Sequence, residues 1–172
     1  GSLGGHLRIY GKQGHIAYPD KIINPILKSG DLISKLNTKI WDKGNEAFDP
    51  TSFQISNIKS GTGAHNVVPG ELELTFNFRF SPESSEKSLK LEFESLLNEL
   101  DIKYDIVWDL NGTPYYTKNG LFRSIVSDSV KEITGYAPEL NAKGGTSDGR
   151  FVAKMNAEIV ELGPVNQSIH QI

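Results

Sequence analysis

The sequence has four histidines, which are versatile catalytic side chains, and no cysteine. The four are His6, His15, His65 and His170. No two are spaced as a helical zinc motif requires, and thiolate ligands are excluded. An isolated histidine is most often structural. We favour a functional interpretation for His15, which lies in a glycine-bearing turn after a predicted strand, and for His170, which follows the loop at the end of another.

A glycine-rich stretch over residues 144–151 reads Gly-Gly-Thr-Ser-Asp-Gly-Arg-Phe. A glycine turn that opens a helix exposes backbone amides to an anion, so a carboxylate could bind here. The same stretch could instead be a tight connection in which Thr146 or Ser147 caps the helix, and local chemistry leaves both interpretations open. Neither the dinucleotide-binding nor the P-loop spacing is present, which disfavours phosphate chemistry.

Two further polar residues have a chemical and a bland interpretation. Arg79 falls on the polar face of a predicted strand, and an arginine on a rigid strand suits bidentate binding of a carboxylate. A solvated surface charge is the usual alternative. Asn66 could form a turn or donate a hydrogen bond to a substrate.

Chain length and net charge limit the classes of protein to which this sequence can belong. The 172 residues suffice for one domain, or for a small domain and part of another. With 18 basic and 21 acidic residues the formal net charge is -3, so neither nucleic acid nor a membrane surface is an expected partner. No apolar stretch approaches the roughly 20 residues of a membrane span. Because the absence of cysteine fits a reducing compartment, we expect a soluble cytoplasmic protein.

Apolar periodicity predicts six elements that would position these residues. The clearest is the strand over 71–80, where Leu and Phe alternate with polar residues. Asn24 and Pro25 begin a helix that ends near Trp41. The predicted order is strand 1–11, helix 25–41, strand 53–58, strand 71–80, helix 89–100 and strand 102–108. This βαββαβ order predicts an α+β fold with a ferredoxin-like antiparallel sheet and two helices on one face. Its edge strands make dimerisation plausible.

A second unit is predicted over residues 112–172, after a first domain over 1–111. It comprises a helix over 122–133 that ends at Gly135, a short helix over 147–154 and a strand over 158–162. The alternation indicates α/β architecture. So few elements cannot bury a core by themselves, so we expect this unit to be incomplete.

Several motifs together resemble those of the bacterial succinyl-diaminopimelate desuccinylases, a family of zinc-dependent metallohydrolases. They span the whole chain in matching order, at residues 11–19, 66–70, 77–81, 144–151 and 161–170. The resemblance implies an amidohydrolase with two zinc ions per subunit, with cobalt as an alternative at one site. Its small-molecule substrate would be N-succinyl-LL-2,6-diaminopimelate, from which it releases succinate in lysine biosynthesis. It also implies a homodimer formed through residues 1–111.

The resemblance assigns roles to individual residues. His170 would bind one zinc ion, and His15 would reach into the partner's site to stabilise the oxyanion of the intermediate. Asn66 would act from the opposite subunit as well. Substrate carboxylates and polar groups would be bound by Gly145, Thr146, Arg79, Arg150 and Asn166.

The chain departs from the family in the residues that bind metal. The N-terminal histidine, aspartate and paired-glutamate motifs of the family are absent from the sequence. We therefore expect a portion of the enzyme that binds no zinc pair and is inactive by itself. Two alternatives are a sibling N-acyl amino acid deacylase, such as an acetylornithine deacetylase or a peptidase, and a non-catalytic dimerisation module.

Overall fold

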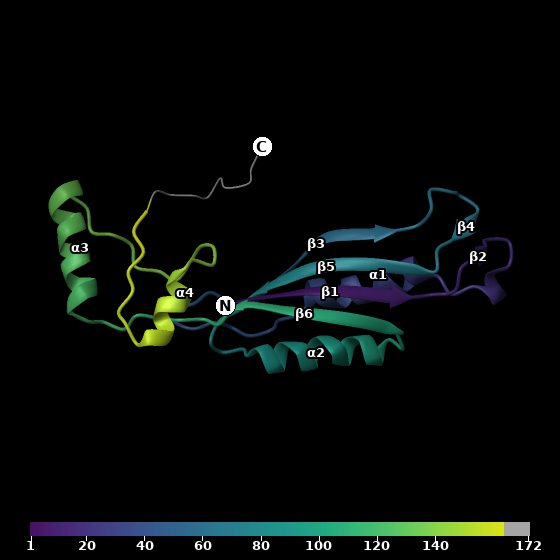
Figure 1. The fold of residues 1–172 in the computed structure, drawn as a ribbon, viewed down its shortest axis with the longest axis horizontal. Coiled ribbons are helices and arrows are strands. Elements are labelled where there is room, and N and C mark those ends of the chain that lie inside the picture. Colours follow the sequence, from purple (N-terminus) through teal and green to yellow (C-terminus); the bar gives the residue numbers. More distant parts are fainter. Residues whose placement is uncertain (164–172) are drawn as a thin grey trace.

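The computed structural model describes residues 1–163 and is built around a four-stranded antiparallel sheet (Figure 1). The strands are ordered β3, β5, β1, β6, and helices α1 and α2 pack on one face. The predicted ferredoxin-like sandwich is thus confirmed. The elements of this part are β1 (Ser2–Tyr10), β2 (Gly14–His15), η1 (Pro19–Lys21), α1 (Pro25–Thr38), β3 (Ser52–Ser60), β4 (Val67–Val68), β5 (Glu71–Arg79), α2 (Glu86–Glu99) and β6 (Tyr104–Gly112).

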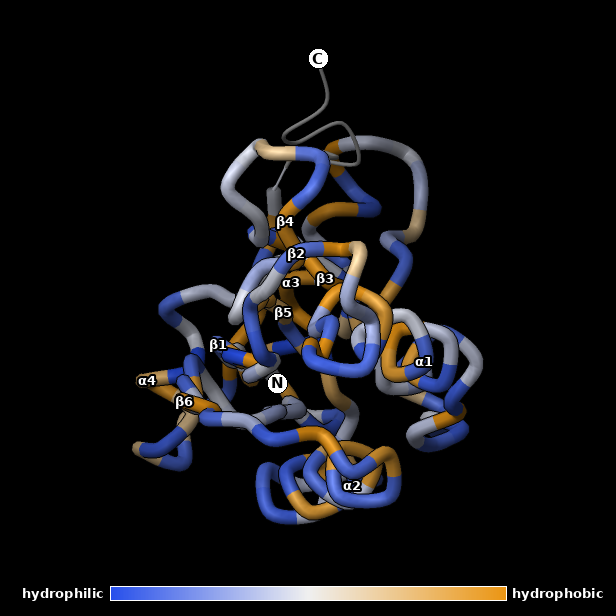
Figure 2. The backbone as a smooth tube through the Cα atoms, turned by 90° about the vertical axis from the view of Figure 1, so that its right-hand side faces the viewer, coloured by the Kyte–Doolittle hydropathy of each residue, from blue (hydrophilic) through white to orange (hydrophobic). Residues whose placement is uncertain are grey.

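Strand register keeps the apolar side chains on one face of the sheet. Leu7 of β1 lies opposite Leu74 of β5 and Ile106 of β6. Side chains alternate between faces along a strand, so this register directs every second residue toward the helices. Figure 2 shows the same segregation in α1 and α2, where hydrophobic and hydrophilic stretches alternate along each helix.

Helix α1 begins as predicted and ends earlier. The Asn24 side chain accepts hydrogen bonds from the backbone N–H groups of Ile26 and Leu27, with Pro25 in the first turn. The helix ends at Thr38, because the next residue is extended. Trp41, where the helix was predicted to end, leaves the helix and packs edge-on against Phe78 at a centroid distance of 4.7 Å. Its burial serves the core, not the helix face.

An aromatic cluster fills the space between the sheet and the helices. Phe76 of β5 stacks on Phe93 of α2 with ring centroids 4.6 Å apart, and Phe53 of β3 lies 4.9 Å from Phe78. Phe76, Phe78 and Phe93 are fully buried. Such pairs add to the free energy gained from burial alone, so this cluster holds the helices to the sheet.

Helix α2 begins with a reciprocal cap. The Ser85 hydroxyl accepts from the backbone N–H of Ser88, whose hydroxyl accepts from the N–H of Ser85. Leu89, Phe93 and Leu97 are its buried residues. This cap fixes where the helix starts and hence which face meets the sheet.

Asp42 fastens the long connection between α1 and β3 to the turn after β5. One carboxylate oxygen accepts the backbone N–H groups of Gly44 (2.8 Å) and Thr51 (2.9 Å). The other accepts the hydroxyls of Ser81 (3.1 Å), Ser84 (2.5 Å) and Thr51. Charge-assisted hydrogen bonds of this kind are stronger than neutral ones, so Asp42 replaces regular structure as the restraint on this connection.

The remaining described residues form a second, thinly packed part with one helix of 14 residues and two short helical turns. These are α3 (Leu121–Thr134), α4 (Gly149–Val152) and η2 (Ala153–Met155). Gly135 ends α3 in a left-handed conformation (φ 81°), as predicted. None of the residues of α3 is buried, and Ile133 is 85% exposed. The domain boundary after residue 111 remains a prediction.

The prediction of a strand over 158–162 was wrong, because these residues adopt no regular structure. A strand persists only where a neighbouring strand accepts its hydrogen bonds. No strand of the described residues pairs with this segment, and the backbone N–H of Ile159 donates to the Thr117 hydroxyl instead (3.0 Å). The segment has the alternating pattern of a strand, but no neighbouring strand of the described residues forms backbone hydrogen bonds with it.

Candidate functional site

Arg79 and Thr146, 67 residues apart in sequence, meet at one end of the sheet. Arg79 is the exposed last residue of β5, and its Nη1 donates a 2.6 Å hydrogen bond to the Thr146 hydroxyl. Thr146 belongs to the glycine-rich stretch before α4. The structure therefore joins two of the predicted site residues.

Arg150 of α4 joins the same cluster. A side chain carbon built on Gly112, the last residue of β6, would lie 3.0 Å from Cδ of Arg150 and 3.6 Å from the Thr146 methyl. The β1 residue Ser2 pairs with both Arg79 and Gly112. These ends of β5 and β6 therefore lie side by side, and the loop before α4 packs against both. The Nε of Arg150 is buried without a hydrogen-bond partner. The Arg150 guanidinium itself stacks on the Phe151 ring, 4.6 Å from its centroid. The Arg79 guanidinium and the Thr146 hydroxyl, with the stem of Arg150 beside them, suit a carboxylate.

The loop itself uses its residues in different ways. Gly144 has φ of 110°, a conformation open mainly to glycine. Gly145 is exposed, with no heavy atom near the position of a side chain, which leaves its backbone accessible. The Ser147 hydroxyl accepts from the N–H of Gly149 (3.2 Å). Neither Thr146 nor Ser147 is the N-cap of α4, which is Asp148 and makes no side-chain cap hydrogen bond. The Ser147 hydroxyl makes a local turn contact instead, and the Thr146 hydroxyl faces Arg79.

His15 and Asn66 lie together at the other end of the sheet. His15 of β2 pairs with Val67 of β4, and the backbone N–H of Ile16 donates to the Asn66 carbonyl (3.2 Å). His15 is exposed, and its Nδ1 accepts the backbone N–H of Ala17 (3.1 Å). In the neutral imidazole an accepting Nδ1 leaves the proton on Nε2, which can be donated outward.

The length of β5 separates these two groups of residues. Its nine residues run from Glu71, just after β4, to Arg79, a span of about 27 Å at the usual rise of a strand. Figure 1 shows β2 and β4 at one end of the sheet and α4 at the other. No side chain bridges that distance, so His15 and Arg79 of one copy cannot line the same site.

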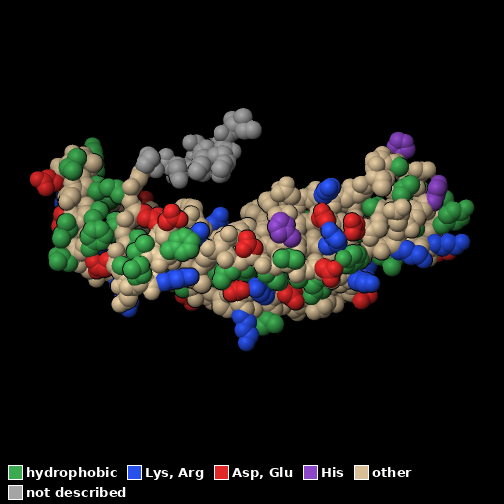
Figure 3. Space-filling model, in the orientation of Figure 1, with side chains coloured by type: hydrophobic (Ala, Val, Ile, Leu, Met, Phe, Trp, Pro, Cys, Tyr) green, Lys and Arg blue, Asp and Glu red, His purple; other side chains and the backbone are tan. Residues whose placement is uncertain are grey.

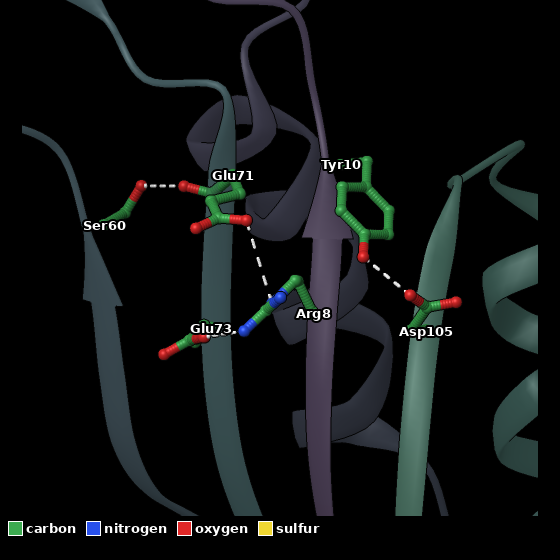
Figure 4. A network of polar contacts seen from close by, with 6 residues as sticks. All are labelled: Arg8, Tyr10, Ser60, Glu71, Glu73 and Asp105. Carbon is green, nitrogen blue, oxygen red and sulfur yellow. Dashed lines mark hydrogen bonds and ion pairs between the residues drawn. The ribbon is translucent and has the colours of Figure 1, made fainter.

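The open face of the sheet carries charges that are paired with one another. Arg8 donates to Glu73 (2.7 Å) and lies 3.7 Å from Glu71, while the Tyr10 hydroxyl donates to Asp105 (2.6 Å; Figure 4). The hydrogen bond that Arg8 donates to Glu73 helps to raise the pKa of Arg8. Figure 3 shows acidic and basic side chains interspersed over this face. The charged groups named here on this face are therefore paired with one another.

Metal ligation is the part of the predicted site that the described residues do not provide. Within residues 1–163 no three histidine, aspartate or glutamate side chains form a group that could hold a metal ion. The predicted ligand His170 and the predicted substrate-binding residue Asn166 lie outside the described residues. In the same range no helix has the length and apolarity to cross a membrane.

Two residues near the loop, Tyr115 and Glu161, were missed by sequence reasoning. The hydroxyl of Tyr115 donates to Glu161 (2.5 Å) and lies 3.0 Å from the hydroxyl of Ser147. These residues are 32 and 46 positions apart from Tyr115. No local spacing signals such a contact.

Curated relatives agree with the motifs of the sequence. Over 172 residues the chain is 50% identical to the succinyl-diaminopimelate desuccinylase of Methylococcus capsulatus and 48% identical to that of Nitrosomonas eutropha. Each match covers 100% of this chain and 46% of the relative. The predicted resemblance is confirmed, and the chain spans less than half the length of these relatives.

Comparison of structures and of family models concerns the fold. An M20 family metallo-carboxypeptidase from Sulfolobus solfataricus superposes with a TM-score of 0.75 at 16% identity, over 91% of this chain and 55% of that one. At that identity the likeness shows the fold alone. The model of the peptidase dimerisation domain matches residues 1–105, which include the β3-β5-β1-β6 sheet up to the start of β6 and both covering helices. The chain therefore belongs to the peptidase dimerisation domain family.

Proposed function

We propose that this chain is part of a cytoplasmic, metal-dependent amidohydrolase that converts N-succinyl-LL-2,6-diaminopimelate to succinate and LL-2,6-diaminopimelate in lysine biosynthesis. The observation that carries the proposal is the gathering of Arg79, Thr146 and Arg150 at one end of the sheet. Both the succinyl group and the amino acid part of this substrate end in carboxylates. Relatives that are 50% and 48% identical to this chain are named for this substrate, which favours it over acetylornithine.

Substrate recognition would follow from the chemistry of that cluster. A guanidinium group binds a carboxylate through two parallel hydrogen bonds. Arg79 has an exposed side chain on a rigid strand, and Arg150 has an Nε without a partner. Thr146 would donate a third hydrogen bond by turning its hydroxyl from its present contact. Gly145 would allow the substrate to approach the backbone, and Asn166, outside the described residues, would add an amide.

His15 would act on the carbonyl group that reacts. The proton on its Nε2 can be donated to the oxygen that becomes negatively charged in the tetrahedral intermediate. His15 lies in β2, which pairs with β4 just before β5 begins, whereas Arg79 is the last residue of β5, so His15 would serve the site of a second copy. Asn66 lies beside it and would accompany it.

A homodimer would satisfy this requirement. β3 is an outer strand of the sheet, with Ile58 56% exposed, and Leu27 of α1 is 73% exposed. An edge strand with unpaired backbone groups pairs readily with a copy of itself about a twofold axis. We propose that residues 1–111 form the dimer through strand-edge and helix contacts.

Metal would be held elsewhere in the enzyme. The described residues do not fit a metal ion, and a catalytic zinc site uses about three protein ligands. Two zinc ions, with cobalt as an alternative at one position, are therefore proposed for the full-length enzyme, to which His170 would contribute. We expect the 172-residue chain by itself to be inactive.

The test is an assay of the full-length enzyme for succinate release. N-succinyl-LL-2,6-diaminopimelate should be hydrolysed with a kcat/KM at least about a hundredfold above that for N-acetylornithine, as expected when buried polar groups lose their partner. The Arg79→Ala variant should lose most of this activity. Arg8→Ala, which removes an exposed arginine on the adjacent strand, is the matched control and should retain it. Preference for acetylornithine would refute the proposed substrate.

A further inference from the structure

Three side chains from separate segments converge behind the glycine-rich loop. The Tyr115 hydroxyl donates to the Glu161 carboxylate (2.5 Å), which also accepts the Ser147 hydroxyl. The Ser147 hydroxyl in turn accepts the N–H of Gly149 (3.2 Å). Tyr115 precedes α3, Ser147 precedes α4, and Glu161 follows η2. The loop is thereby connected to both flanking segments.

The position of Gly149 indicates how closely these groups approach the loop. A side chain carbon at Gly149 would lie 2.5 Å from the Tyr115 hydroxyl and 2.7 Å from the Glu161 carboxylate. Both distances are too short for any other residue to fit without moving the two side chains. The first turn of α4 therefore packs directly against the Tyr115–Glu161 pair.

Ser147 transmits this restraint to the residues that face Arg79. It is the immediate neighbour of Thr146, whose hydroxyl is 2.6 Å from Nη1 of Arg79. Its carbonyl oxygen accepts the backbone N–H of Arg150 (3.4 Å). A shift of Ser147 would displace Thr146 and Arg150 together. Misplacement of a recognition group by about 1 Å is enough to weaken binding or catalysis substantially.

We propose that Tyr115 and Glu161 are positioning residues that hold the loop so that Thr146 and Arg150 face the substrate carboxylate beside Arg79. This inference rests on the proposed function, because it takes the loop to be part of a carboxylate site. Tyr115 and Glu161 touch no substrate in this arrangement. They act through Ser147.

Tyr115 is suited to the role at neutral pH. Its side chain is half-buried, and this burial, together with the hydrogen bond to Glu161, raises the pKa of the phenol. The hydroxyl therefore stays protonated and remains a donor to the carboxylate. The glutamate accepts from two hydroxyls at one oxygen, which fixes both donors relative to each other.

The experiment compares Tyr115→Phe with Tyr10→Phe in the full-length enzyme. Tyr10 makes the same kind of contact, a 2.6 Å hydrogen bond to Asp105 on the open sheet face (Figure 4). It pairs with Glu71, at the opposite end of β5 from Arg79 and the loop. Each substitution removes only the hydroxyl, so both variants should fold. Ser147→Ala provides a second variant that breaks the same connection from the other side.

Two measurements are made on each protein. Hydrogen exchange at the amides of Gly149 and Arg150 should accelerate about threefold to tenfold in Tyr115→Phe, as expected for the loss of one hydrogen bond, and stay unchanged in Tyr10→Phe. KM for the succinylated substrate should rise by a similar factor of about three to ten, with kcat within about twofold of wild type. A merely destabilised enzyme would not show this division between KM and kcat.

The outcomes separate the inference from the proposed function. Unchanged exchange in Tyr115→Phe and Ser147→Ala would overturn the positioning role, as would an unchanged KM in an active enzyme. Faster exchange in an enzyme that never releases succinate would support the restraint on the loop and refute the proposed function instead.

Discussion

A mixture of two inactive variants should regain activity if each site draws residues from two copies. His15→Ala removes the proposed oxyanion donor, and Arg79→Ala removes the proposed carboxylate ligand. Each homodimer then lacks the same residue at both of its sites. In a heterodimer of the two variants, one site receives the intact Arg79 of one copy and the intact His15 of the other, and the second site lacks both.

The expected recovery follows from this geometry. His15 lies in β2, beside the start of β5, and Arg79 ends β5, about 27 Å away at the rise of a strand, so the two residues of one copy cannot line the same site. Random reassortment of equal amounts gives about half heterodimers, each with one intact site of two. About a quarter of all sites, and hence about a quarter of wild-type kcat per subunit, should be restored.

The assay is succinate release after the variants are mixed in mild denaturant and refolded, so that subunits exchange. Mixtures that are combined without exchange control for simple addition of residual activities. Mutated residues that shared a site within one chain would give no recovery after exchange. That result would refute the assignment of His15 to the partner's site and the separation on which it depends.

Further predictions concern the fold that holds these residues apart. Asp42→Ala should lower the free energy of unfolding by about 2–4 kcal/mol, because it leaves the buried Thr51 and Ser81 donors without an acceptor; a loss below about 0.5 kcal/mol in urea denaturation would contradict this role. Burial alone would raise the pKa of the Asp42 carboxyl, but hydrogen bonds from Ser84 and Thr51 hold it well below its usual value of 3.8. The stabilisation by the Asp42 carboxylate is therefore complete above about pH 4 and declines at lower pH. The difference in unfolding free energy between wild type and Asp42→Asn should shrink as the pH falls below about 4. A constant difference from pH 7 to pH 2.5 would show that ionisation of Asp42 is not coupled to stability. Phe93→Ala should cost about 3–5 kcal/mol in the same denaturation experiment, since it removes a fully buried ring stacked on Phe76, and a cost near that of a surface substitution would show that the aromatic cluster does not hold α2 to the sheet.

The sandwich was predictable because its elements carry local signals that agree with one another. β5 alternates without interruption, and its apolar residues are all buried. Asn24 and Pro25 mark the start of α1 chemically. The end of α1 was less predictable, since Trp41 is as apolar as a helix residue and its burial against Phe78 depends on a strand 37 residues later. Asp42 was not identified either, because its acceptor role appears only when two distant turns meet.

The segment over 158–162 shows where a local pattern fails. Its alternation is that of a strand, but a strand is defined by hydrogen bonds to a neighbour. The described residues offer none, and the apolar residues of α3 are exposed among them, so this part buries little of its apolar surface there. Periodicity predicts what a segment can form, and the surroundings decide whether it does.

For the site, sequence reasoning nominated single residues and left their interpretation open. Arg79 alone was more consistent with a solvated charge, and the glycine-rich loop was as consistent with a simple helix cap as with an anion site. The 2.6 Å contact between Arg79 and Thr146 makes the chemical interpretation more specific, since it places a guanidinium group beside the loop. The Tyr115–Ser147–Glu161 contacts were beyond reach, because all three residue types are common on surfaces and their spacing has no period.

Under the proposed assignment of His15 to the partner's site, the length of the sheet would matter for function as well as for structure. A two-residue insertion in β5 and its neighbours would preserve the alternation of faces and could preserve the core. It would nevertheless move His15 about 7 Å farther from Arg79, since each residue of a strand adds about 3.4 Å. In a symmetric dimer the same displacement occurs at both sites. Strand length would then be restrained by the reach of His15 into the partner, even where stability alone would tolerate a longer sheet.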